Sequence, residues 1–100
     1  MLSKAECNVL GGLIKKYRVA LNRLVAERAS NETRAEVMSV QSDAHDWLTK
    51  HLGAVHAESF LAAEPWNQVP ANYPSRYGGI YQQSRGKLNY LKSIPNTHCH

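Results

Sequence analysis

The sequence has few cysteines and one phenylalanine, and its prolines are absent from the first 64 residues. Its 100 residues include four prolines, six glycines, two cysteines and one phenylalanine. All four prolines follow Glu64, so the first 64 residues form a proline-free stretch that favours long helices. No segment alternates apolar and polar residues over a useful length, which excludes a β-sheet architecture. No apolar run approaches the ~18 residues that a membrane span needs, so we expect no membrane contact.

The two cysteines, Cys7 and Cys99, stand at opposite ends of the chain. Two are too few for a disulfide framework. Lys4 and Glu6 stand where a secretory signal would have its apolar stretch, which indicates no signal peptide. We therefore expect reduced thiols and a cytoplasmic location. The alternative is a bridge between the two cysteines, which would tether the tail to the first helix.

Length and charge indicate one small soluble domain with a thin core. All-helical chains of this size often dimerise to cover an apolar stripe, so a homodimer is one expectation. The formal net charge of +4 suits an acidic protein partner or a nucleic acid and does not decide between them.

The first helix is predicted from a capping box and an apolar stripe. Ser3 and Glu6 have the spacing at which each side chain caps the other's backbone amide. Gly11 and Gly12 cost up to ~1 kcal/mol each in a helix interior. Either another backbone comes close to them, or the helix is weak there. The stripe has alternating steps of three and four residues: Cys7, Leu10, Ile14, Tyr17, Leu21 and Leu24.

A second helix should follow a short connection near Ala29. Asn31 or Thr33 could cap it, and Thr33–Glu36 has the spacing of a second capping box. The helix either ends at Gly53 in a left-handed cap, or bends there and continues through Ala63. Its predicted buried side consists of Val37, Val40, Ala44, Trp47, Leu48 and Leu52.

The composition changes at Pro65, which ends the helical region. Residues 66–75 should form an extended loop, followed by one short helix within about 82–93 that Pro95 ends. The predicted fold is therefore all-α: an antiparallel helical hairpin over 1–63, crossed by a proline-, tyrosine- and arginine-rich segment over 64–100 with a short C-terminal helix. We predict a single domain over 1–100.

No pattern indicates catalysis or a cofactor. No nucleophile elbow or phosphate-binding loop is present. His45, His51 and His56 are spaced by six and five residues, whereas helical metal pairs need three or four. The tail His98–His100 offers three adjacent ligands that could share a metal with Cys7 or a second chain. A frayed terminus is the simpler interpretation, and we predict no metal, no cofactor and no enzymatic activity.

The C-terminal segment interleaves cations with aromatic residues, a composition typical of protein-interface hot spots and of single-strand nucleic-acid binders. We expect a small non-enzymatic module that binds and modulates a larger protein or complex, as a phage- or plasmid-type inhibitor does. A nucleic-acid-binding module using this tail or the basic side of the first helix is the alternative, and a small metal-dependent enzyme is a third class. The predicted partner-binding residues are Trp66, Tyr73, Arg76, Tyr77, Tyr81, Arg85 and Lys87.

Overall fold

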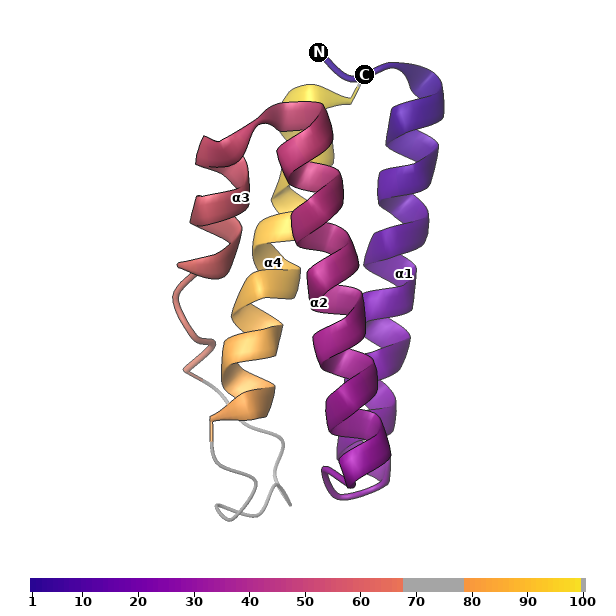
Figure 1. Cartoon of the computed structure of the whole chain (residues 1–100), viewed down its shortest axis with the longest axis vertical. Helices are drawn as coiled ribbons and strands as arrows, with labels where there is room; N and C mark the ends of the chain where they lie inside the picture. The colour runs from indigo at the N-terminus through magenta and orange to yellow at the C-terminus, as the bar shows by residue number, and fades with distance from the viewer. Residues whose placement is uncertain (68–78, 100) are drawn as a thin grey trace.

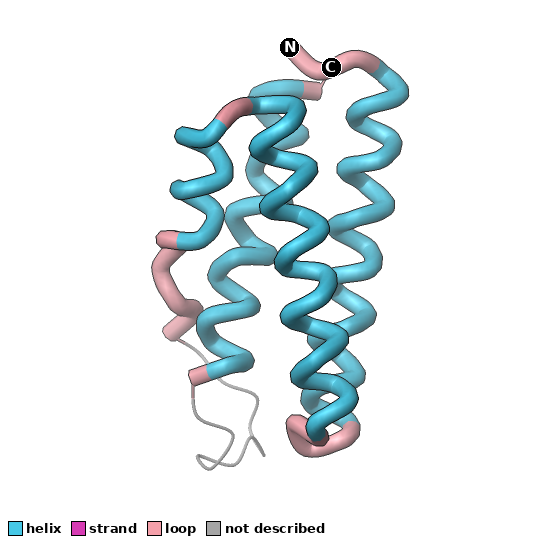
Figure 2. Tube along the Cα trace, viewed as in Figure 1, coloured by secondary structure: helices cyan, strands magenta, loops and turns pink. Residues whose placement is uncertain are grey.

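The computed structural model of the chain describes residues 1–67 and 79–99. Within these residues the chain forms four helices and no strand (Figure 2). The prediction of an all-α fold is confirmed. The helices are α1 (Lys4–Ala26), α2 (Asn31–Leu52), α3 (Ala54–Leu61) and α4 (Ile80–His98). None of the described helices is long and apolar enough to span a membrane.

α1 begins at the predicted capping box. The Ser3 amide donates to the Glu6 carboxylate at 2.8 Å, and the Glu6 amide donates to the Ser3 hydroxyl at 3.1 Å. Two backbone amides that the helix itself leaves without partners are thereby satisfied. The predicted stripe is buried from Leu10 to Leu24, whereas Cys7 is only half-buried.

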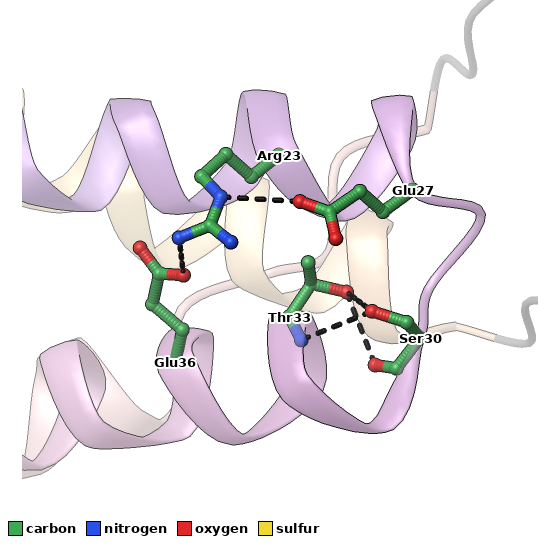
Figure 3. Close-up of polar contacts among 5 residues, drawn as sticks. All are labelled: Arg23, Glu27, Ser30, Thr33 and Glu36. Atoms are coloured by element: carbon green, nitrogen blue, oxygen red, sulfur yellow. Dashed lines mark hydrogen bonds and ion pairs between the residues drawn. The ribbon is translucent and has the colours of Figure 1, made fainter.

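α2 begins at a cap that the sequence pattern did not indicate. Ser30, rather than Asn31 or Thr33, precedes the helix, and its hydroxyl accepts from the Thr33 amide at 3.3 Å. The Thr33 hydroxyl donates to the Ser30 carbonyl at 3.0 Å, so Thr33 is buried in the turn instead of capping it (Figure 3). Arg28 and Ala29 both have a φ of 54°, and this left-handed pair lets the chain reverse direction within a few residues.

The second capping box predicted at Thr33–Glu36 does not form. Glu36 instead accepts from the Arg23 guanidinium at 2.5 Å, across the junction of α1 and α2. The same guanidinium donates to Glu27 at 3.2 Å, so one arginine joins two carboxylates (Figure 3). The tertiary ion pair takes the carboxylate that a capping box would need.

Gly53 separates α2 from α3. Its φ of 93° is a conformation that favours glycine, and its amide donates to the Leu48 carbonyl at 3.0 Å. The sequence predicted either an end at Gly53 or a bend with continuation. Both features occur, because α2 ends at Gly53 and α3 starts at the next residue in a new direction. α3 ends at Leu61, before Pro65.

α4 is longer than predicted. It covers Ile80–His98 instead of about 82–93, and Pro95 lies inside it. Pro95 cannot donate to the carbonyl four residues before it, yet the helix continues for three more residues. This last turn is held by contacts to the other end of the chain, where the Leu2 amide donates to the His98 carbonyl at 3.0 Å and Cys99 is bridged to Cys7. The expected loop over 66–75 falls mainly outside the described residues.

The helices form two layers around one core. α1 and α2 lie side by side and run in opposite directions, and α4 and α3 cover their inner side (Figure 1). Tyr17 of α1 and Phe60 of α3 meet edge to face with ring centroids 6.4 Å apart. α4 contributes Leu88, Leu91 and Ile94 to the same core. The apolar stripe of α1 is therefore covered within one chain.

Candidate functional site

The predicted contact residues divide between described and undescribed parts of the chain. Tyr73, Arg76 and Tyr77 lie outside the described residues. Tyr81 is 8% exposed and belongs to the core, so it presents little surface. Lys87 is half-buried, and this burial lowers the pKa of its ammonium.

Trp66 and Arg85 come together on the surface of α4. The Arg85 guanidinium carbon lies 5.1 Å from the centroid of the Trp66 ring, within cation–π range. The Trp66 ring also lies 6.2 Å from the Tyr81 ring, and the Trp66 amide donates to the Gln82 carbonyl at 2.9 Å. These contacts fix the 62–67 segment on α4 and hold Trp66 half-exposed beside the arginine.

Arg85 has no anionic partner within the described part of the chain. Among the described residues it makes no ion pair, and its buried Nε atom has no hydrogen-bond partner there. A buried donor without an acceptor costs about 1–3 kcal/mol. The Arg85–Trp66 pair is therefore a cationic site that the described chain leaves unneutralised.

A second cluster lies where the two chain termini meet. A His51 ring nitrogen is 2.6 Å from the Glu6 carboxylate, and the His51 ring stacks on Trp47 with centroids 4.6 Å apart. Hydrogen bonds from the Ser3 backbone, from His51 and from the Ser3 side chain lower the pKa of Glu6 to about 2. The Glu6–His51 contact connects the start of α1 to the end of α2.

The cysteines are paired, which corrects the expectation of reduced thiols. Cys7 and Cys99 form a disulfide across 92 residues of sequence. Next to it, the Leu2 amide donates to the His98 carbonyl at 3.0 Å, so both chain ends are tied together. The expectation of reduced thiols followed from the absence of a recognisable secretory signal, and the sequence alone did not show that the fold places the two ends of the chain side by side (Figure 1).

The histidines of this end do not assemble a metal site of ordinary composition. His56 lies 3.0 Å from the Tyr90 hydroxyl, and its ring meets the His98 ring with centroids 5.1 Å apart. Cys99 is in the disulfide, so its sulfur is not a thiolate ligand. Within residues 1–67 and 79–99, no three potential ligands gather closely enough to hold a metal ion.

A groove along the outer side of α1 and α2 is a feature that the sequence patterns did not indicate. It encloses about 400 Å³. Val19 is 47% exposed beside it, and Val9 on the same helix is 52% exposed. The residues that line the groove are Gly12, Lys15, Lys16, Val19, Glu36, Ser39, Val40 and Asp43.

The paired glycines of α1 open onto this outer surface. A Cβ atom added at Gly11 or Gly12 would meet no other atom within 4 Å. Nothing within the described chain therefore requires glycine at these two helix-interior positions, where it weakens the helix. The glycine pair was the sequence signal that could have indicated this surface.

The two walls of the groove carry opposite charge. Lys15 and Lys16 stand on the α1 wall, while Glu36 and Asp43 stand on the α2 wall. Glu36 is paired with Arg23, but among the described residues Lys15, Lys16 and Asp43 make no ion pair. The groove thus has charges of both signs that the described chain leaves unneutralised.

Comparisons with protein-family models, curated proteins and solved structures found no match to this chain.

Proposed function

We propose that this protein is a small non-enzymatic module that binds a larger protein or complex and modulates it, as a stand-alone inhibitor would. The observation that carries the proposal is the Arg85–Trp66 pair. A half-exposed arginine is stacked on a half-exposed tryptophan and has no carboxylate partner among the described residues.

The chemistry of this pair favours a protein partner with an acidic contact surface. Tryptophan and arginine are enriched among the residues that contribute most binding energy at protein interfaces. A guanidinium pre-positioned on an aromatic face loses little side-chain entropy when it meets a carboxylate. Lys87 on the same helix and the net charge of +4 add long-range attraction for such a partner.

The compartment proposed here differs from the one expected from the sequence. A disulfide persists in oxidising surroundings and is rare in the cytosol, where thiols are kept reduced. The Cys7–Cys99 bridge supports a site of action in an oxidising compartment rather than in the cytoplasm.

The proposal is tested by affinity capture from a lysate of the source organism with matched variants of α4. Arg85→Ala removes the stacked cation, whereas Lys92→Ala removes an exposed cation of the same helix that makes no ion pair among the described residues. We expect wild type and Lys92→Ala to capture the same protein and Arg85→Ala to lose it. Circular dichroism of each variant checks that the helices are intact.

Two outcomes would contradict the proposal. One is capture that Arg85→Ala and Lys92→Ala leave equally strong. The other is binding to single-stranded nucleic acid that falls steeply with salt, since several phosphate contacts give a strong dependence on ionic strength. That second result would favour the nucleic-acid alternative.

A further inference from the structure

We propose that the outer groove of α1 and α2 is the contact surface for a second copy of this chain. This contact relies on the opposite charges of the two groove walls and on the matching positions of the charged residues along the helices. It uses a face on the other layer of the molecule from the Arg85–Trp66 pair, so it is independent of the proposed function.

Two polar contacts fix which residues of α1 and α2 stand at the same level. Arg23 meets Glu36 near one end, and Glu6 meets His51 near the other. Lys16 lies seven residues before Arg23, and Asp43 lies seven residues after Glu36. Seven residues are about two helical turns, so Lys16 and Asp43 face the groove at the same level from opposite walls.

Only one of the simple two-fold arrangements brings opposite charges together. If the two-fold axis is parallel to the helices, α1 of one copy packs on α2 of the other. Each residue then keeps its position along the helix direction. Lys16 of each copy then meets Asp43 of the other copy, and the contact occurs twice. An axis perpendicular to the helices lays α1 on α1, which brings lysines against lysines and is disfavoured.

The same arrangement gives Gly12 a role. Gly12 lies one helical turn beyond Lys16, and Trp47 lies one turn beyond Asp43. Trp47 is half-buried against His51 and is on the same face of α2 as Asp43, by helical spacing. Trp47 also packs against the core of its own chain, so in the dimer it is the backbone of the second copy's α2 near Trp47 that lies at the level of Gly12, where the missing side chain lets the two helices approach each other.

The surface is large enough for a dimer of moderate affinity. Helices of 23 and 22 residues are each about 33 Å long, and the two side by side are about 20 Å wide. The face then covers roughly 650 Å² per copy, near the lower bound of standard protein interfaces.

A charge-exchange experiment tests the pairing. Lys16→Glu and Asp43→Lys alter exposed residues that make no ion pair within the described chain, so both variants should fold like wild type, as circular dichroism would check. Sedimentation equilibrium should show a dimer for wild type. Each variant alone should dissociate about tenfold more readily or worse, because it sets like charges opposite each other at both contacts.

An equimolar mixture of the two variants should restore dimers. The carboxylate introduced by Lys16→Glu in one copy would then meet the ammonium introduced by Asp43→Lys in the other, and the native pair would form at the second contact. A chain that sediments as a monomer up to millimolar concentration would overturn the proposal. So would a dimer that neither substitution weakens, since another face would then form it. An Arg85→Ala variant should remain dimeric, so failure here is distinguishable from failure of the proposed function.

Discussion

Tyr17 shows how a single residue can be essential for packing and still carry an unfavourable group. Its ring is fully buried and meets Phe60 edge to face, but its hydroxyl has no hydrogen-bond partner among the described residues. Burial raises the pKa of Tyr17 to about 12, and the nearby Ser84 hydroxyl only partly opposes this rise. The aromatic ring stabilises the core, whereas the hydroxyl is a buried polar group without full compensation.

We therefore expect Tyr17→Phe to keep or raise the free energy of unfolding, by up to about 1 kcal/mol. Tyr17→Ala should lower it by about 3–5 kcal/mol, because it leaves a cavity at the centre of the bundle. Urea denaturation measures both changes. A loss of more than about 1 kcal/mol in Tyr17→Phe would mean that the hydroxyl has a partner, with Ser84 the nearest candidate.

Tyr17 should also make the free energy of unfolding depend on pH in the alkaline range. Since the pKa of Tyr17 is about 12 in the folded protein and the ordinary pKa of a tyrosine is about 10, unfolding favours ionisation of this phenol between those values. Its contribution is fully present below pH 10 and is lost as the pH rises through 12, amounting to about 2–3 kcal/mol. Tyr17→Phe should lack this component, so wild type should lose stability faster than the variant over the window.

At the scale of elements, the contact between α4 and the 62–67 segment depends on one glycine. A Cβ atom at Gly86 would overlap the Glu64 carbonyl oxygen and lie 2.9 Å from its carbonyl carbon. The neighbouring Trp66 amide bonds to Gln82, so the segment cannot shift without losing that hydrogen bond. Backbone, rather than a flexible side chain, sets this limit.

Gly86→Ala should destabilise the protein by about 1–3 kcal/mol, because it forces the 62–67 segment off α4. Gly11→Ala is the matched control, since its Cβ would enter open space. It should instead stabilise α1 by about 0.5–1 kcal/mol through better helix propensity. Thermal or urea unfolding of both variants gives the comparison, and equal effects in the two would show that Gly86 is not in close contact.

Local patterns predicted the helices well and their tertiary connections poorly. The capping box at Ser3 and the stripe of α1 depend on neighbours within one or two turns, and both are confirmed. The capping box predicted at Thr33–Glu36 does not form because the Glu36 carboxylate pairs with Arg23, a residue of another helix. The end of α4 was placed too early because its last turn, which includes Pro95, is held by the Leu2–His98 backbone bond and the Cys7–Cys99 bridge, both of which join distant parts of the sequence.

The candidate sites also depend on contacts between distant segments, which local sequence patterns do not predict. The association of Arg85 with Trp66 needs the 62–67 segment to fold back on α4, which no periodicity reveals. The outer groove of α1 and α2 cannot be predicted until it is known that α3 and α4 cover the inner face of this helix pair. From the sequence alone, Gly11 and Gly12 could have indicated the outer surface of α1, because glycine weakens a helix and no local feature requires it at these positions.

At the scale of the whole molecule, the disulfide closes the chain from its first helix to its last. Cys7 and Cys99 are 92 residues apart, so the bridge restricts nearly the entire unfolded chain. In the chain-entropy account, closing a loop of this length stabilises the folded state by about 4–5 kcal/mol. For a protein of 100 residues with a thin core, this is a large share of the usual stability of about 5–15 kcal/mol.

Reduction should therefore lower the free energy of unfolding by up to about 4 kcal/mol and loosen the end where α1 starts and α4 finishes. Urea denaturation with and without a thiol reductant measures the loss. The double variant Cys7→Ser with Cys99→Ser should match the reduced protein and be insensitive to the reductant. Hydrogen exchange should locate the loosening near Leu2 and His98, whose backbone bond lies next to the bridge. Free thiols in the unreduced protein, or unchanged stability on reduction, would contradict both the bridge and the oxidising compartment inferred from it.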